Sequence, residues 1–569
     1  MAYILAACIS RILGCILICK EKTEDFSIYQ NAKDRCMEKN KSNGIVDQAA
    51  ILLVAMLLSR VLGFLMRVPL THFIGDAGNA YYSAAFQVYT FLLVLSSAGL
   101  PAAISKLVSE RITLKRYHDA HAVYNVSLFI SAVSGVVGAV AILFGARLVA
   151  DLINQPLSYY SMIALAPTVL IVGIMAVLRG YFQGMNTTKP TAISQIIEQL
   201  FNVVFSILFA WALHSRGPEY GAAGGAAGTG IGAIAGLAVM LIIYSLNSKF
   251  LKKRLKEARI PQQESYAEIA SAVFRTAWPI ILGTAVFSIM GLIDMATISN
   301  LLVSTEAFTR EEVDIMFGQY NGKYIVLTTM PIAISAALAT AVIPSIAASK
   351  ALNDEATVTA KVNLALRLAM LLTIPAAIGL SVLGDPIVRM LFPTEPEGGY
   401  LLQWGGMAVV FLALYQMATG ILQGLGYVKL PVIGAAAAAV VKISLNYLLI
   451  SNPEINILGA VFSTVACYSV AALLNTILLK RVTQIKIDFI SILIKPLICA
   501  VGMGIVSYGV YEAVFLLTQS NAIGVILAIT FGAAVYFLGM LLIKGIERSD
   551  LEQMPMSSKL IRAMDRLGM

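Results

Sequence analysis

Long apolar runs, separated by short stretches rich in glycine, proline and charged residues, recur along almost the whole chain. Most runs reach about 20 residues, the length that an α-helix needs to cross a hydrocarbon layer roughly 30 Å thick. The pattern predicts fourteen spanning helices, because fourteen runs can be separated by their polar boundaries. They lie near residues 45–73, 81–108, 121–146, 157–180, 190–213, 221–246, 269–302, 322–349, 363–383, 400–424, 431–451, 456–479, 490–513 and 521–544.

Basic residues alternate strongly from one connection to the next. Connections after even-numbered runs carry sixteen Lys and Arg residues, whereas those after odd-numbered runs carry four. Because short cytoplasmic connections are enriched in Lys and Arg, the richer set is predicted to face the cytoplasm. With fourteen spans, both ends of the helical core are then cytoplasmic, and the acidic connection 303–321 lies outside.

Short motifs recur in the same order in the two halves of the chain. LPAAIS at 100–105 matches MPIAIS at 330–335, and GYFQG at 180–184 matches GILQG at 420–424. Six spans separate the copies, which predicts two parallel six-helix lobes around a central cavity, with spans 13 and 14 added. Gly184 and Gly424, at equivalent cytoplasmic turns, are hinge candidates, and simple tight turns are the alternative.

The pattern also divides the chain into regions. We expect an N-lobe at 45–246, a basic cytoplasmic linker at 247–268, a C-lobe at 269–480, two further spans at 481–545 and a cytoplasmic tail at 546–569. Residues 1–44 do not fit this scheme, since 1–19 is an apolar run interrupted by Arg11 without the features of a signal peptide. An extra helix is one interpretation; we favour an artefactual extension ahead of a start at Met37.

Composition supports a membrane protein. Hydrophobic residues make up 58% of the chain and charged residues 13%, about half the charged share of a soluble protein. The net charge of +9 comes from the basic connections rather than from a basic face that would bind nucleic acid. The six cysteines have no metal-ligand spacing, so no metal site is predicted.

A few cations lie inside the predicted spans. Arg60 and Arg67 are seven residues apart in the first span, so two helical turns place them on nearly one face, and Lys323 begins the eighth span. An ionisable side chain at membrane depth costs at least about 2.5–3.5 kcal/mol, which makes each one a candidate for function. Because the guanidinium fork suits phosphate oxygens, the three predict a site for an anionic substrate.

Carboxylates within the spans are fewer, and Glu198 and Asp294 are the clearest. Lys442 and Asn446 are four apart and share a helix face. A lysine deep in a span needs a counter-charge, and Asp294 is the first candidate. These residues are predicted to form a coupling or ion-pair site, with a purely structural pair as the alternative.

The remaining charged residues and glycine-rich segments in and near the spans do not indicate a binding or catalytic site. Lys106 and Arg179 lie near helix ends, where long cationic side chains usually reach the interface. The segment 318–324 lacks the spacing and the Ser or Thr of a phosphate-binding loop, so no nucleotide is expected. No nucleophile, base or metal constellation was found, which predicts a protein that is not an enzyme and has no cofactor.

The motifs SRVLGF at 59–64, RVPL at 67–70 and SAGLPAAIS at 97–105 resemble the polysaccharide-flippase branch of the multidrug/oligosaccharidyl-lipid/polysaccharide exporter superfamily. The resemblance is to its stage V sporulation protein B-like members and covers residues 45 to about 544. It implies an alternating-access carrier of undecaprenyl-pyrophosphate-linked sugars, typically the peptidoglycan precursor lipid II, in the bacterial cell membrane. Arg60, Arg67 and Lys323 match the cavity cations of the family by position.

The resemblance also bears on energy coupling. Some family members bind sodium between spans 7, 11 and 12, where Asp294, Asn446 and Thr464 match and Lys442 stands at another ligand's position. The resemblance therefore implies that the Lys442 ammonium replaces sodium and that membrane potential or protons drive transport. Three alternatives stay open: a flippase for another cell-surface polysaccharide precursor, a cation-coupled multidrug exporter of the same fold, and a scaffold for cell-wall enzymes.

Overall fold

The computed structural model describes residues 41–258, 260–352, 354–427, 429–485, 487–543 and 545. Across these ranges all regular structure is helical, which confirms the predicted all-α fold. The extension at 1–40 and the tail at 546–569 lie outside the described residues.

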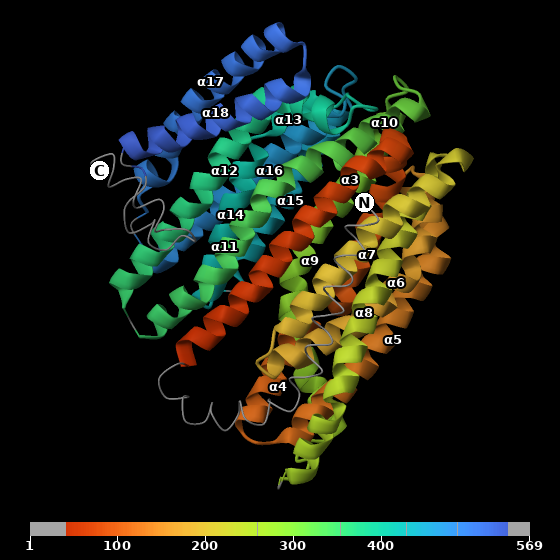
Figure 1. The fold of residues 1–569 in the computed structure, drawn as a ribbon, viewed down its shortest axis with the longest axis vertical. Helices are drawn as coiled ribbons and strands as arrows, with labels where there is room; N and C mark the ends of the chain where they lie inside the picture. The colour runs from red at the N-terminus through yellow and green to blue at the C-terminus, as the bar shows by residue number, and fades with distance from the viewer. Residues whose placement is uncertain are drawn as a thin grey trace.

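The first six long helices form one bundle, called here the first bundle (Figure 1). Their connections are short, as the sequence predicts. The helices are α3 (Lys41–Leu93), α4 (Leu100–Thr113), α5 (Tyr117–Leu152), α6 (Tyr159–Gly184), α7 (Lys189–Leu213) and α8 (Pro218–Glu257), with short turns η1 (Val94–Ala98), η2 (Pro156–Ser158) and η3 (His214–Arg216).

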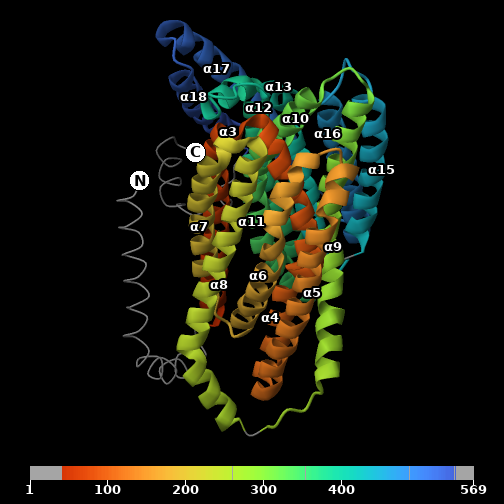
Figure 2. The same ribbon diagram turned by 90° about the vertical axis from the view of Figure 1, so that its right-hand side faces the viewer.

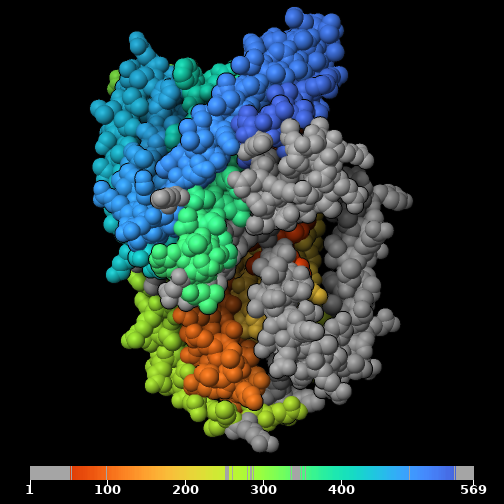
Figure 3. All heavy atoms as spheres, turned by 90° about the vertical axis from the view of Figure 1, so that its left-hand side faces the viewer, coloured from red at the N-terminus to blue at the C-terminus, as the bar shows by residue number. Residues whose placement is uncertain are grey.

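The second bundle begins where a linker returns the chain from α8 to α9, at one end of the molecule (Figure 2). It comprises α9 (Tyr266–Ser304), α10 (Arg310–Gln319), the π-helical turn η4 (Tyr320–Tyr324), α11 (Ile325–Ala351), α12 (Glu355–Leu391), α13 (Gly399–Gly405), α14 (Ala408–Gly424), α15 (Leu430–Ile450) and α16 (Leu458–Thr483). The turn η5 (Ile490–Ile494) leads to α17 (Lys495–Thr518) and α18 (Asn521–Leu542), which pack on each other and on α12 (Figure 3).

The first two predicted spans are not separated by a loop. The first span and residues 81–93 of the second form one element, α3, and the rest of the second span continues in η1 and α4. Helix α3 reverses at Gly75, whose φ of 66° is easily adopted only by glycine. Across the reversal, Asn79 Nδ2 donates a hydrogen bond of 2.9 Å to Thr71 Oγ1. Arg67 likewise lies 4.6 Å from the ring of Tyr82, although fifteen residues of straight helix would separate them by about 22 Å.

Helix α9 belongs to both cores. Ile269, Val273 and Ala277, in its first half, are buried in a cluster with residues of α4, α5, α6 and α8. Met295 and Ile298, in its second half, join the larger core, which contains residues of both bundles. Helix α9 therefore contacts the first bundle with both halves and the second bundle with its second half.

The chain is a multi-pass membrane protein. Ten helices in the described part are long and apolar enough to cross a membrane, or eleven if α13 and α14, bent by 54°, form one span. The count of fourteen spans stays a prediction.

Candidate functional site

Arg67 lies in the first half of α3 and faces the second half. Its guanidinium carbon is 4.6 Å from the ring centroid of Tyr82, a cation–π contact that stabilises the charge. Its Nη1 atom is enclosed and has no hydrogen-bond partner among the described residues. An enclosed donor without an acceptor costs about 1–3 kcal/mol. The site therefore lacks an acceptor that an anionic ligand can supply.

Arg60, predicted to share the role of Arg67, has different surroundings. Its side chain is exposed, whereas that of Arg67 is partly buried. No hydrogen bond or ion pair joins Arg60 to another residue in the described ranges. The structure thus leaves two cations on α3 without carboxylate partners in that part of the chain, one enclosed and one accessible.

Lys323, the third predicted substrate cation, is fully buried in an ion pair. Its Nζ atom lies 2.7 Å from Asp76 Oδ2 and donates to the carbonyl oxygens of Glu395 at 2.7 Å and Glu397 at 2.9 Å. The ring of Phe392 lies 5.7 Å from the ammonium. In this conformation Lys323 does not face a free site; it joins the first bundle to the second.

Helix α10 docks on the first bundle beside this ion pair. Tyr81 donates a hydrogen bond of 2.8 Å to Asp314 Oδ2, and Gln155 Nε2 donates one of 2.9 Å to Oδ1. Burial raises the pKa of Asp314, while these two hydrogen bonds and nearby Arg310 oppose the shift. A capping box of Thr309 and Glu312 begins the helix, and its Thr309 backbone N–H lowers the pKa of Glu312.

Two further residues of the first bundle bind the end of α9. Gln155 Nε2 also donates to Ser299 Oγ at 3.1 Å, and Asn154 Nδ2 donates to Asn300 Oδ1 at 2.7 Å. Together these groups close one end of the interface between the bundles. We call them the α10 seal, which comprises Asp76, Tyr81, Asn154, Gln155, Ser299, Asn300, Asp314 and Lys323.

A cavity of about 230 Å³ lies between the bundles next to the seal. Half of its lining comes from α3, beginning at Val68 directly after Arg67, and half from the end of α12 and the residues after it. Phe392, which contacts the Lys323 ammonium, is part of the lining. The cavity therefore lies between the two bundles beside Phe392, and neither Arg67 nor Lys323 is among its lining residues.

The predicted coupling residues meet inside the second bundle. Lys442 Nζ lies 3.0 Å from Asp294 Oδ1 and donates to Thr464 Oγ1 at 2.8 Å. Asp294 also accepts from the hydroxyl of Tyr320 at 3.0 Å and from Asn446 Nδ2 at 3.4 Å. The charges cancel within this network, and in the described ranges no group of three or more His, Cys, Asp or Glu residues could hold a metal ion.

Glu198 is not part of that network; it pairs with Arg179 in the first bundle. Arg179 Nη2 lies 2.7 Å from Glu198 Oε2, and the guanidinium also donates to Ser194 Oγ. The sequence favoured an interfacial position for Arg179, which stays a prediction; the structure adds a carboxylate partner that the sequence reasoning did not assign. Lys106 remains exposed, 3.9 Å from Glu110.

The hinge candidates end helices α6 and α14. A Cβ atom at Gly184 would lie 2.7 Å from the Cβ of Val108, so close packing against α4 accounts for this glycine. Gly424 is the last residue of α14. Their role as hinges stays a prediction.

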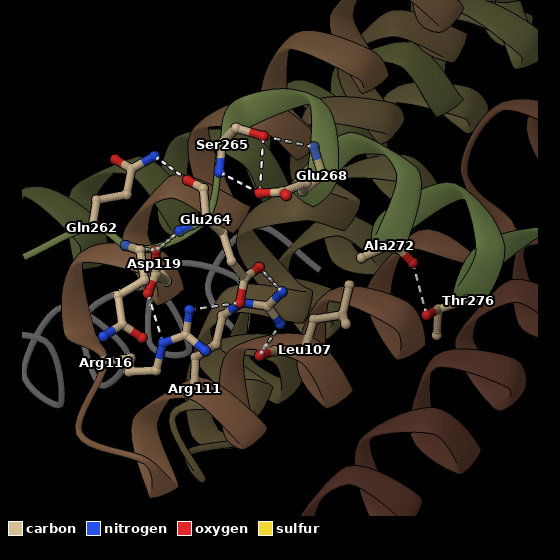
Figure 4. A network of polar contacts seen from close by, with 11 residues as sticks. Leu107, Arg111, Arg116, Asp119, Gln262, Glu264, Ser265, Glu268, Ala272 and Thr276 are labelled. Atoms are coloured by element: carbon tan, nitrogen blue, oxygen red, sulfur yellow. Dashed lines mark hydrogen bonds and ion pairs between the residues drawn. The ribbon is translucent and has the colours of Figure 1, made fainter.

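A polar cluster that the sequence reasoning missed lies around the end of α4 (Figure 4), at the opposite end of the molecule from α10. Arg111 and Arg116 both form ion pairs with Glu264 of the linker, the second at 2.9 Å. Arg116 also pairs with Asp119 at 2.8 Å, and Asp119 Oδ1 accepts from the backbone N–H groups of Gln263 and Glu264. We call Arg111, Arg116, Asp119 and Glu264 the linker clamp.

Comparison with known proteins agrees with this architecture. The profile of the polysaccharide biosynthesis protein family matches residues 45–350, and that of the MatE family matches residues 324–448. Stage V sporulation protein B of Bacillus subtilis (strain 168) is 26% identical over 522 residues, which cover 90% of this chain and 98% of the relative. Lipid II flippase MurJ of the same organism is 25% identical, covering 85% and 93%.

Two solved structures share the fold. A lipid II flippase MurJ in an inward closed conformation has a TM-score of 0.62 at 16% identity, covering 86% of this chain and 98% of that one. An inward-facing multidrug resistance MATE family transporter has a TM-score of 0.62 at 16% identity, covering 77% and 98%.

The names of these relatives describe flippases and transporters rather than catalysts, and the prediction that the chain is not an enzyme is confirmed on that ground. The resemblance read from the motifs is confirmed as well. Since the first profile matches more than half of the sequence, the chain belongs to the polysaccharide biosynthesis protein family.

Proposed function

We propose that the protein is a flippase that moves a lipid-linked polysaccharide precursor across the bacterial cell membrane by alternating access. The family match and the flippase among the relatives support this function. The proposed substrate class is a polyprenyl-pyrophosphate-linked sugar, and the specific candidate is lipid II.

The enclosed guanidinium of Arg67 carries the proposal. Its Nη1 donor lacks an acceptor among the described residues, and a pyrophosphate offers several oxygens for charge-assisted hydrogen bonds. The accessible Arg60 adds a second positive charge on the same helix. The polyprenyl tail would remain in the lipid, since only the polar headgroup needs a path through the protein.

The α10 seal corresponds to the state of the transport cycle in which the carrier is closed at the α10 end. Its hydrogen bonds and ion pair join the two bundles at one end, so a carrier in this state admits substrate from the other end. The distribution of basic residues predicts that the α10 end faces outside. The opposite state requires these bonds to break.

Energy coupling is proposed to be independent of sodium. The Lys442 ammonium, 3.0 Å from Asp294 and 2.8 Å from Thr464, occupies the place where a cation would meet these oxygens. We expect the same flipping rate in vesicles with sodium or potassium gradients. A rate that rises with sodium would contradict this part of the proposal.

The test is complementation of a bacterial strain depleted of its lipid II flippase. We expect growth with the wild-type protein and loss of growth with Arg67→Ala, because the headgroup loses its enclosed donor. Arg216→Ala is the matched control, since Arg216 is exposed at the end of η3. Full rescue by Arg67→Ala at equal expression would refute the proposed site.

A multidrug exporter is the second candidate, because the MatE profile matches part of the chain. Such a carrier of cationic drugs would meet an enclosed cation at Arg67, which repels its substrate. Drug efflux by the wild-type protein, without rescue of the depleted strain, would favour this alternative.

A further inference from the structure

Of the three groups that accept hydrogen bonds from Lys323, two lie in the second bundle and one in the first. Lys323 lies on η4, and the carbonyl groups of Glu395 and Glu397 lie in the segment between α12 and α13, so all three belong to the second bundle. Among the described residues, Asp76 is the one hydrogen-bonding partner that comes from the first bundle. When the bundles separate at the α10 end, the two carbonyls stay with Lys323 and Asp76 leaves.

An ammonium group has three donors and no acceptor. Here the three partners are Asp76 Oδ2 and the two carbonyl oxygens, at 2.7 to 2.9 Å. Loss of Asp76 therefore leaves one donor open and the positive charge without a counter-charge, while the carbonyls still hold the side chain in place. The open state would present a fixed, charged donor to an incoming anion.

The position of Asp76 is also fixed by its own helix. The left-handed turn at Gly75 places Asp76 at the tip of the reversal in α3. Its backbone carbonyl packs against Gly318 of α10, where a Cβ atom would overlap the carbonyl oxygen. Closure of the α10 end thus brings the carboxylate to Lys323 in one defined geometry.

We propose that Asp76 takes the place of the substrate's phosphate at Lys323 and thereby expels the headgroup when the α10 end closes. This inference rests on the proposed function. In the open state Lys323 binds a phosphate oxygen of the lipid-linked substrate; on closure the carboxylate replaces that oxygen. The same ammonium is then a substrate-binding group in one state and part of the seal in the other.

Physical considerations support such an exchange. A carboxylate attached to a rigid helix is delivered at high effective concentration, so it can compete with a ligand that binds tightly. The resulting pair is neutral, which spares the empty carrier an uncompensated charge at depth while it returns. The exchange also explains how a cation predicted to bind substrate can be fully buried here.

The experiment separates closing from substrate binding. Closing is measured in purified protein as protection of Ser299→Cys from a maleimide, in a background without the six native cysteines, because Ser299 is buried in the seal. Binding is measured with undecaprenyl pyrophosphate as the probe, and flipping in vesicles. The variants are Asp76→Asn and the charge-swapped pair Asp76→Lys with Lys323→Asp, which keeps opposite charges across the interface but loses the two hydrogen bonds to the carbonyls of Glu395 and Glu397.

With Asp76→Asn we expect the probe to bind at least about tenfold more tightly, the equivalent of one charge-assisted hydrogen bond, and flipping to slow because release fails. Protection of Ser299→Cys shows whether the swapped pair still closes; where it does, we expect flipping to fall at least about tenfold. Unchanged affinity in Asp76→Asn, or wild-type flipping by the swapped pair, would show that the pair only seals the interface.

The same measurements distinguish failure of the proposed function from failure of this inference. If the wild-type protein does not bind the probe, both proposals are overturned. If the wild type binds it and Arg67→Ala abolishes binding, but the Asp76 and Lys323 variants bind and flip normally, the function stands and this inference is wrong.

Discussion

The α10 seal and the linker clamp lie at opposite ends of the molecule, and both are rich in charge. The seal joins the two bundles to each other, whereas the clamp joins the first bundle to the linker. In the seal, Asp76 and Asp314 bind partners that belong to the other bundle. In the clamp, Arg111 and Arg116 of the first bundle hold Glu264 of the linker. The seal has to break if the bundles separate at its end, whereas the clamp can remain intact.

This difference shows that the effect of an ion pair on transport depends on whether its two partners belong to the same bundle or to different bundles. A pair inside one rigid body contributes to the stability of every conformation. A pair between two bodies changes the balance between conformations and can serve transport. The following changes test that distinction, from the largest expected effect to the smallest.

Lys442→Met breaks a buried pair within one bundle. It leaves Asp294 buried without its counter-charge, and we expect a loss of about 3–5 kcal/mol in the free energy of unfolding. Thermal unfolding in detergent measures the loss. Lys442→Met combined with Asp294→Asn should recover part of it, and labelling of Ser299→Cys in the folded protein should not change. A strong rise in labelling would mean that this pair also controls the seal.

Gly318→Ala acts on the boundary between the bundles. The added Cβ overlaps the Asp76 carbonyl oxygen, and overpacking of this kind costs about 1–3 kcal/mol. We expect faster labelling of Ser299→Cys at almost unchanged thermal stability, because the open state avoids the overlap. Gly502→Ala is the control, since a Cβ there meets nothing within 4 Å. Equal labelling in both variants would contradict the close contact.

Glu264→Gln weakens the clamp. The carboxylate is partly exposed, so we expect its loss to lower stability by about 1 kcal/mol or less. Labelling of Ser299→Cys should stay at the wild-type rate, since the clamp does not join the bundles directly. An altered rate would show that the linker takes part in closing.

A pH titration should produce the smallest effect. Burial raises the pKa of Asp314 while α10 is docked, so the docked state binds a proton more tightly than the undocked one. The contribution to docking is complete below the ordinary pKa of an aspartate and is lost as the pH rises through the raised pKa. Acid also lowers the thiolate fraction, so the rate is compared at each pH with that of the same cysteine in denatured protein. Relative to this reference, we expect slower labelling of Ser299→Cys in acid, and loss of this dependence in Asp314→Asn. Faster labelling in acid would reverse the sign.

The all-helical fold could be predicted because apolar runs of membrane length are a local property of the sequence. The partner of Lys442 could also be named, since a cation deep in a span needs a counter-charge and few carboxylates are available. The pairing of Lys323 with Asp76 could not, because Asp76 lies in a polar connection where a charged residue is expected to be hydrated. Tertiary packing, which brings together residues 247 positions apart, decides such contacts.

Helix α9 imposes a mechanical constraint on the whole molecule. Gln87 of α3 donates to the backbone carbonyl of Ser288 at 3.2 Å, and the next turn carries Gly291, where a larger residue would strike the same glutamine. Its first half is embedded in a core of the first bundle, and its second half in a core that both bundles share. A rotation of one bundle against the other therefore has to bend this helix or rearrange the packing of its second half, and either change contributes to the energy of the conformational change.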